Sequence, residues 1–435
     1  MKVLKSILTL FGALAVLTLS SCNRDSYEPF PEPSDVRRVM MMYCCGYNNL
    51  SSDIYDDIQE LCTNLPDGRT EHFYKVIIFS HLTKPIGTTR DDNDYVTPCN
   101  PVLIDAYKDK FGQTVLDTVK IYPADMISGS AEAVREVMND VRQMFPAREY
   151  GMIVSSHGTG WLPNWYYDKK NEDDWIMFSP SPGSNAQRQI RMPLSSYSHP
   201  LEGPKVKSMM AQGYIINNKI ATYEVEVRDF AACLPYHLNY LVLDMCLMGG
   251  IEQAYELAGK VDYLAFSPTE VLSGGFRYDT AVDRLLLSFK PDVAGFCDDY
   301  YHKYADSGRY ASISLIDCNR LDNLASVCNS LFAKYHSQMM QVNPRQIQGY
   351  FRGSKHWYYD LRDILVCCGI DRNERTALDN ALSECVLYNQ ATEIFISIRI
   401  NTHCGFSMYL PSNGDSYLDD FYKEYRWNKA TSLVR

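Results

Sequence analysis

The chain has 435 residues, of which 46% are hydrophobic and 22% are charged, with 24 glycines and 20 prolines. This is the composition of a globular protein long enough for more than one core, and it excludes a disordered, fibrous or repeat-built chain. Lys and Arg number 42 against 53 Asp and Glu, which gives a net charge of -11. Such a charge disfavours a nucleic acid as the main partner.

The first 22 residues have the pattern of a targeting segment. Two lysines precede an apolar core at 7–19, and small residues then lead to Cys22. This ending resembles a bacterial lipoprotein signal, which implies a signal peptide over 1–21 and a lipid on Cys22; an ordinary secretory signal is the alternative. Asn23 in place of an acid resembles outer-membrane sorting. We therefore expect a protein anchored by lipid in the bacterial cell envelope, at the outer membrane, facing either the periplasm or the exterior.

The stretch 22–36 is rich in proline and acids and is typical of an extended tether, so folded structure is expected from about Arg37. Short apolar runs then alternate with amphipathic helical patterns. The expected strands are 39–45, 74–79, 150–154, 238–243 and 263–266. The expected helices are 49–61, a segment capped by Ser128 that runs to Phe145, 223–234 and 250–258. This alternation predicts an α/β protein with a mostly parallel sheet and helices on both faces.

The alternation stops between residues 162 and 219, where Pro, Gly, Ser and Asn are dense. We predict a long insertion or mobile loop there. Past residue 316 the rhythm is less regular, with an expected helix, an aromatic cluster and a strand-like run at 321–335, 356–360 and 393–400. These patterns predict a main domain over 37–315 and a smaller carboxy-terminal domain over 316–435.

The fourteen cysteines are irregularly spaced and include no zinc-type pair. Most lie in apolar runs, where a reduced cysteine packs as a small hydrophobic residue. The exceptions are Cys22 and Cys246. The histidines show no metal-binding spacing, and no glycine-rich phosphate loop follows a strand, so no cofactor is expected.

Two apolar runs end on reactive residues: His157 and Gly158 follow one, and Asp244 and Cys246 end the other. A parallel sheet presents side chains to ligands at the carboxyl ends of its strands. A cysteine nucleophile needs a base beside it, which His157 would supply. Gly158 would leave room for substrate backbone, and the N–H groups of Gly158 and Cys246 would face an oxyanion. Taken singly, a core or capping histidine and a buried thiol are the ordinary explanations.

Asp244 lies two positions before Cys246, which on a strand puts both side chains on one face. Its carboxylate would line the pocket and pair with a basic substrate side chain. Orienting the histidine and capping a turn are the alternatives that the spacing leaves open.

The two blocks resemble those of caspase-like cysteine peptidases, and specifically those of the clostripain family. In that family the first block has the form DHG.GW, and the other block has the form DACLM followed by E..YEL. Here they are SSHGTGW at 155–161 and DMCLMGGIEQAYEL at 244–257. Further matches are YNNLSSDI near the amino terminus, SPTEVLSGGFRYD after the third strand, YYDLRDI at 358–364 and CGFSMYLP near the carboxyl end.

The resemblance implies a caspase-like fold and hydrolysis of peptide bonds through a thioester on Cys246, with His157 as its partner. It also implies that Asp244 helps to form a pocket for Arg or Lys before the scissile bond. Glu270 and Asp279 are further pocket candidates, and either could equally be a solvated surface acid. The expected partners are peptides or proteins with basic residues.

Family members often cut themselves between the His and the Cys. Basic residues suited to such a cut are Arg188, Arg191, Lys205, Lys207 and Lys219. Two features depart from the family pattern, since Ser156 replaces the usual acid before the histidine and the loop after Trp161 is longer than expected. Some relatives depend on calcium, but the acidic run at 91–94 lacks the glycine and terminal glutamate of an EF-hand loop and favours a solvated turn.

Two other functions remain open at the level of the sequence. One is a lipid-anchored peptide-binding protein that keeps the fold with little or no activity. The other is a hydrolase or transferase that acts on other amides through the same Cys246 and His157.

Overall fold

The computed structural model describes residues 35–48, 50–67, 70–83, 99–164, 175–177, 209–216, 219–353 and 356–435. All of them lie in one compact unit, Pro33–Arg435. Several predicted features lie outside the described residues: the signal peptide, Cys22, most of the tether, the acidic run at 91–94, and Arg188, Arg191, Lys205 and Lys207.

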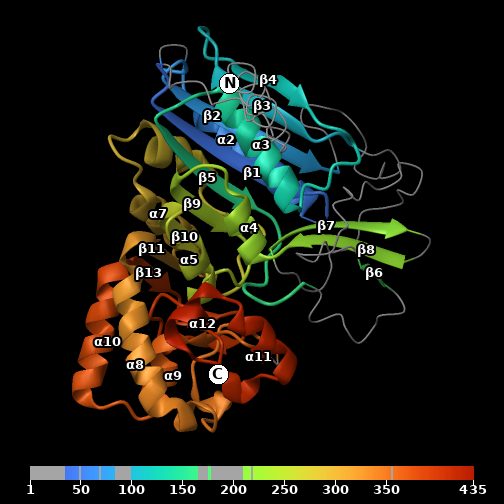
Figure 1. Cartoon of the computed structure of the whole chain (residues 1–435). Coiled ribbons are helices and arrows are strands. Elements are labelled where there is room, and N and C mark those ends of the chain that lie inside the picture. The colour runs from blue at the N-terminus through green and yellow to red at the C-terminus, as the bar shows by residue number, and fades with distance from the viewer. Residues whose placement is uncertain are drawn as a thin grey trace, which may run out of the picture. The chain divides into compact units, whose positions relative to one another are not determined.

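Nine strands form a central sheet in the order β13-β11-β10-β9-β5-β1-β2-β3-β4, which crosses the molecule in Figure 1. Their bounds are β1 (Arg38–Gly46), β2 (Tyr74–Leu82), β3 (Val102–Lys108), β4 (Thr114–Ile121), β5 (Glu149–Ser155), β9 (Leu238–Asp244), β10 (Val261–Phe266), β11 (Ser312–Asp317) and β13 (Val386–Ala391). The five strands from β10 to β2 pair in parallel, and antiparallel strands extend the sheet at both sides. The predicted α/β fold is confirmed.

Helices cover both faces of this sheet. One face packs against α2 (Ser51–Leu61), α6 (Tyr278–Ala281) and α7 (Val293–Ala305). The core on the other face contains residues of α3 (Ala131–Met144), α4 (Val227–Cys233), α5 (Ile251–Leu257), α8 (Leu321–Met339), α9 (Leu361–Cys367), α10 (Arg372–Cys385), α11 (Ser416–Lys423) and α12 (Arg426–Thr431). Each face of the sheet has its own hydrophobic core. In β1, Met42 belongs to the core on the side of α2, which we call the first core, and Tyr43 belongs to the core on the side of α3, which we call the second core. The strand is therefore a continuous apolar run, as expected for a strand buried on both faces.

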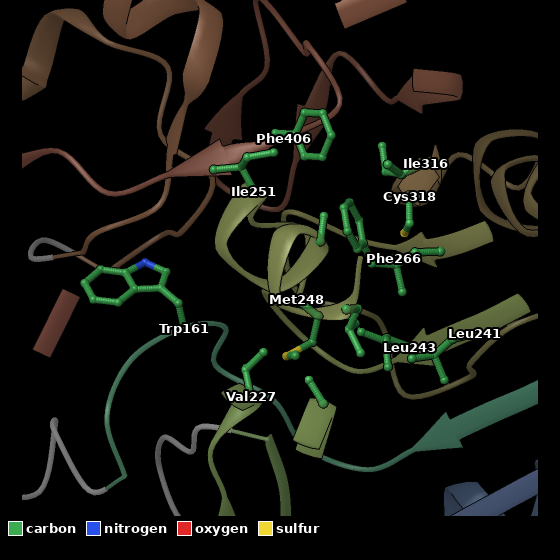
Figure 2. Packing of buried hydrophobic residues seen from close by; sticks show 14 of the residues in the cluster. Trp161, Val227, Leu241, Leu243, Met248, Ile251, Phe266, Ile316, Cys318 and Phe406 are labelled. Atoms are coloured by element: carbon green, nitrogen blue, oxygen red, sulfur yellow. The ribbon is translucent and has the colours of Figure 1, made fainter. Parts of the chain in front are cut away.

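The second core joins the sheet to the carboxy-terminal part of the chain (Figure 2). Leu241 of β9 and Phe266 of β10 belong to it, together with Ile251 of α5 and Phe406. The rings of Phe266 and Phe406 meet edge to face, with centroids 6.2 Å apart. Residues far apart in sequence thus share one apolar interior.

The predicted cap at Ser128 is wrong by two residues. The side chain of Ser130 accepts a hydrogen bond from the N–H of Ala133 and caps α3. Ser128 is fully buried, and its hydroxyl bonds with the ring of His81 at 2.8 Å. Both serines suit a cap by type, and the tertiary contact of Ser128 decides between them.

The segment between β5 and α4 contains a second, three-stranded sheet in the order β6-β8-β7. Its strands are β6 (Trp175–Met177), β7 (Met209–Ile216) and β8 (Lys219–Val225). Apart from residues 162–164, the described part of the predicted insertion is thus strand rather than irregular loop. The helix predicted over 223–234 is shorter at its start, because residues 223–225 pair with β7 and α4 begins only at Val227.

The carboxy-terminal part contributes to the central sheet, since β13 pairs antiparallel with β11. The strand-like run predicted at 393–400 is a small hairpin of β14 (Ile394–Phe395) and β15 (Ile398–Arg399), and β12 (Tyr359–Asp360) pairs with β16 (Ser407–Met408). The contacts show no break near residue 315, and the domain boundary expected there stays a prediction. Among the described residues, no helix is both long enough and apolar enough to cross a membrane.

Candidate active site

The register of β5 and β9 brings the two reactive blocks together. These strands pair in parallel, with Ser155 opposite Asp244 at their carboxyl ends. His157 and Cys246 each lie two residues beyond this pair. Because neighbouring parallel strands end at the same edge, the two side chains emerge side by side.

A cavity of about 110 Å³ lies at this edge. The amino-terminal half of α2 and the loops after β5, β9 and β10 form its walls. Its lining residues are Leu50, Asp53, Ile54, Asp57, Ser155, Ser156, His157, Asp244, Met245, Cys246, Val271, Leu272, Ser273 and Gly275. The structure thus places His157, Asp244 and Cys246 around one cavity.

The turn that carries Cys246 is held tightly. The next residue, Leu247, has a left-handed backbone with φ of 60°, which is strained for a non-glycine residue. Two backbone hydrogen bonds tie the turn to the loop after β10: Leu247 N–H donates to Thr269 O and Gly249 N–H donates to Ser267 O, both at 2.8 Å. These bonds keep the thiol at the strand end.

Gly158 is needed for the approach of the two reactive loops. A Cβ atom at this position would lie 2.9 Å from the carbonyl oxygen of Cys246 and 2.9 Å from Cβ of Met245. The expected room for substrate at Gly158 is therefore filled by the Cys246 loop itself. Glycine serves here to bring the His157 and Cys246 segments into contact.

The thiol of Cys246 is hydrogen-bonded to the backbone of one residue, Val271. The N–H of Val271 donates to Sγ at 3.3 Å, and the thiol donates to the Val271 carbonyl at 3.6 Å. Burial raises the pKa of Cys246 to about 12; the carboxylates of Glu270 and Asp244 raise it as well, whereas the Val271 hydrogen bond and Arg352 lower it. In this conformation the sulfur is held as a thiol.

Asp244 is 6% exposed and accepts two hydroxyl hydrogen bonds. Tyr278 Oη donates to its Oδ2 at 2.6 Å, and Ser155 Oγ donates at 3.3 Å. Burial raises the pKa of Asp244 to about 6, although both hydroxyls and the charge of Lys303 lower it. Its side chain faces the cavity and is not used as a turn cap.

Ser156, which departs from the family pattern, is nearly buried. Its hydroxyl donates to the carbonyl of Cys45 at 2.7 Å, and its N–H donates to the carbonyl of Asp244 at 3.4 Å. The residue before His157 is therefore bonded to both neighbouring strands, β1 and β9.

The other two pocket candidates do not line the cavity as described. Glu270 forms a bidentate ion pair with Arg352, with contacts of 3.0 to 3.2 Å. Asp279 pairs with Arg277 at 2.6 Å. Neither carboxylate lines the cavity with Asp244, and each is paired with a nearby arginine.

Sequence reasoning missed Asp57, which lies at the cavity on α2. A signal was present, because Asp57 falls on the same helical face as Ile54, Ile58 and Leu61, and an acid on an apolar helical face is unusual. It also missed the roles of Val271 and Tyr278, although both lie in the block SPTEVLSGGFRYD that resembles the clostripain family.

No group of three or more metal-ligand side chains is present in the described ranges, and every cysteine in those ranges is free. Cys246 is partly exposed, whereas most of the other described cysteines are buried, as expected for core thiols.

Comparison with known proteins identifies the fold and the family. The chain is similar to an inactive zymogen of a C11 protease from Parabacteroides distasonis, with a TM-score of 0.69 and 21% identity over 92% of this chain and 99% of that one. It is also similar to a secreted C11 cysteine protease from Bacteroides thetaiotaomicron, with a TM-score of 0.67 and 23% identity over 92% of this chain and 100% of that one. A secreted C11 cysteine protease from the same organism in complex with an irreversible peptide inhibitor has a TM-score of 0.68 and 19% identity over 91% of this chain and 99% of that one. At these identities the likeness shows the fold.

The comparison with curated proteins found no match. The model of the clostripain family matches residues 213–433, which is just over half of the chain and includes Asp244 and Cys246. Together with the motifs around His157 and Cys246, this match shows that the chain belongs to the clostripain family of cysteine peptidases.

Proposed function

We propose that this peptidase cleaves peptide bonds after Arg or Lys, with Cys246 as nucleophile and His157 as its base. The observation that carries the proposal is a buried carboxylate, Asp244, in the same small cavity as the thiol and the imidazole. A buried negative charge beside the nucleophile favours a substrate side chain of opposite charge.

The reaction follows from these groups. His157 takes the proton of Cys246 as Sγ attacks the substrate carbonyl carbon, and the N–H groups of Gly158 and Cys246 stabilise the oxyanion. The C–N bond then breaks, the leaving amine takes the proton from His157, and a thioester remains. Water, deprotonated by His157, hydrolyses the thioester and frees the thiol.

The Val271 contact supports a second candidate, a peptide-binding protein of the same fold with weak or no activity. A thiol with a pKa of about 12 that is bonded to a peptide group is a poor nucleophile. If the protein is a peptidase, this contact must be released, either by the binding of substrate or by self-cleavage of the chain between His157 and Cys246.

Hydrolysis of fluorogenic peptides that end in Arg, Lys, Gln or Glu tests the proposal. The mature chain is expected to cleave the Arg and Lys peptides, and Cys246→Ala and His157→Ala are expected to lose this activity by several orders of magnitude. Cys367→Ala, which removes an exposed thiol on α9, is the matched control and keeps full activity. Intact mass before and after incubation reports self-cleavage. Unchanged activity in Cys246→Ala contradicts the mechanism, and an inert, uncut chain favours the binding protein.

We also propose that a lipid on Cys22 anchors the protein in the outer membrane. The support is the sequence of the targeting segment. Incorporation of labelled palmitate into the full-length chain, and its loss in Cys22→Ala, tests this proposal; equal labelling of both chains contradicts it.

A further inference from the structure

A second acid, Asp57, faces the same cavity from α2. It is 4% exposed, and no hydrogen bond joins its carboxylate to another group within the described part of the chain. A buried carboxylate without hydrogen-bond partners is costly, and such groups usually have a functional reason. Asp244 differs, since Tyr278 and Ser155 both donate to it.

The carboxylates of Asp57 and Asp244 converge on one point at Gly275. A Cβ atom on Gly275 would lie 2.9 and 3.0 Å from the two carboxylate oxygens of Asp57 and 3.0 Å from Oδ2 of Asp244. Gly275 also has a left-handed backbone, with φ of 54°. A glycine at this position leaves open the space between the two acids, beside the cavity.

The charges around the pair do not neutralise it. Lys303 is the nearby cation, but its ammonium donates to the carbonyls of Gly274 and Phe276 and pairs with Glu60 at 3.4 Å. The titratable and charged groups near Asp57 are Asp53 and Glu60 on its own helix, Cys44 on β1, Asp244 on β9, Tyr278 on α6, and Lys303 and Tyr304 on α7. His157 and Cys246 line the same cavity.

Two adjacent carboxylates in a dry site cannot both be ionised cheaply, so such a pair shares a proton. Burial and the charge of Asp244 raise the pKa of Asp57 to about 9, while burial raises that of Asp244 to about 6. The hydroxyl of Tyr278 favours the ionised form of Asp244. The proton of the pair is therefore held on Asp57 near neutral pH.

We propose that Asp57 is a second specificity-determining carboxylate of this pocket, and that a Lys or Arg side chain of the substrate displaces the proton held between Asp57 and Asp244. This inference rests on the proposed preference for basic residues. One cation enters and one proton leaves to solvent, so the charge of the pocket is unchanged. An uncharged side chain leaves the proton in place.

The exchange predicts a specific pH dependence. Between about pH 6 and pH 9 the pair holds one proton, which it loses as pH rises through about 9, so binding of a basic side chain becomes easier as pH rises toward 9. Binding of an uncharged side chain does not. The ratio of kcat/KM for a Lys peptide to that for the matching norleucine peptide isolates this effect, because the titrations of Cys246 and His157 cancel in the ratio.

The experiment measures this ratio from pH 5.5 to 9 for the unmodified chain, for Asp57→Asn and for Asp56→Asn, each in the form that hydrolyses peptides. Asp56 is an exposed neighbour on α2, and Asp56→Asn removes the same charge as Asp57→Asn. We expect the ratio to rise by up to about tenfold per pH unit between pH 7 and pH 9 in the unmodified chain and in Asp56→Asn. In Asp57→Asn it is expected to be flat above about pH 7, because Asp244, with a pKa of about 6, is already ionised there, and to be about tenfold lower than in the unmodified chain at pH 9.

Each outcome decides a separate point. If the unmodified chain shows no preference for Lys over norleucine at any pH, the proposed function itself fails. If the preference exists but is independent of pH and is the same in Asp57→Asn, only this inference is overturned. The pH profile of the unmodified chain decides the matter even if Asp57→Asn does not fold.

Binding of agmatine, a guanidinium compound that is not hydrolysed, gives a readout independent of catalysis. Titration calorimetry in two buffers with different heats of ionisation counts the protons released. At pH 7.5 we expect the unmodified chain to release close to one proton per agmatine and Asp57→Asn to release none. Binding without proton release by the unmodified chain overturns the inference.

Discussion

The backbone of Val271 holds the thiol of Cys246 through two hydrogen bonds: its N–H donates to Sγ at 3.3 Å, and its carbonyl accepts from Sγ at 3.6 Å. Val271 follows Glu270, whose carboxylate is clamped by the guanidinium of Arg352. The loop after β10 is thus fixed over the nucleophile at two adjacent residues. In this state the sulfur is partly exposed, but it is hydrogen-bonded and protonated.

Breaking the Glu270–Arg352 pair is expected to expose the thiol. Glu270→Ala and Arg352→Ala should both increase the rate at which iodoacetamide labels Cys246 by several-fold, because either change loosens the loop that carries Val271. Mass spectrometry measures the labelling, with the exposed Cys367 as internal reference. The charges alone would act in opposite directions, since Glu270 raises and Arg352 lowers the pKa of Cys246. Opposite effects of the two changes would therefore contradict the clamp.

The rate of labelling in the unmodified chain should depend steeply on pH. Because the pKa of Cys246 is about 12, the thiolate fraction grows about tenfold per pH unit between pH 7 and pH 9. Iodoacetamide labelling across this range should follow the same slope. A plateau below pH 8 would show that His157 already holds the sulfur as a thiolate.

Asp57→Asn is expected to stabilise the protein at alkaline pH. A raised carboxyl pKa means that the folded state binds the proton more tightly than the unfolded chain, so this stabilisation is complete below about pH 4 and is lost as pH rises toward about 9. At pH 8.5 the variant should gain about 1 to 3 kcal/mol in free energy of unfolding over the unmodified chain. Urea denaturation at pH 5 and pH 8.5 measures the change, with Asp56→Asn as control. A gain of equal size at both pH values would mean that the acid pair does not hold the proton.

Gly158→Ala is expected to separate the two reactive loops. The added methyl meets the backbone of Cys246 at 2.9 Å, and backbone cannot move aside cheaply. A displacement of about 1 Å reduces kcat/KM by about a hundredfold, while the overpacking costs about 1 to 3 kcal/mol. Gly308→Ala is the control. Gly308 has a left-handed φ of 69°, so alanine there lowers the stability of the protein, but no atom lies within 4 Å of the new Cβ. Peptide hydrolysis and thermal unfolding of both variants test the difference, and equal activity of the two would contradict it.

Trp161→Ala is expected to damage both stability and activity. Trp161 is fully buried in the loop that follows His157, and its ring meets those of Tyr409 and Tyr422 at 4.8 and 5.1 Å. Its loss should cost about 3 to 5 kcal/mol and shift the histidine loop. Trp427→Ala is the matched control, because Trp427 is equally buried but packs on Tyr255 and not on this loop. If both variants retain the same kcat/KM at a temperature where both are folded, Trp161 supports the fold only.

The strands and helices were largely readable from the sequence. The apolar runs at 39–45, 150–154 and 238–243 lie within β1, β5 and β9. A strand buried on both faces is a continuous run of apolar residues, and such a run can be recognised in the sequence. The errors arose where tertiary contacts chose between local options. Ser128 bonds with His81 while Ser130 caps α3, and residues 223–225 pair with β7 instead of starting a helix.

By itself the sequence determined the family, the α/β alternation and the placement of His157, Asp244 and Cys246 at two strand ends. Local periodicity and short motifs depend only on neighbouring residues, so a single chain carries them in full. Only the tertiary structure decided which groups meet those residues: Asp57 beside Asp244, Val271 against the thiol, and arginines that neutralise Glu270 and Asp279. Such contacts depend on strand order and on the paths of loops, which bring together residues with no local relationship in the chain.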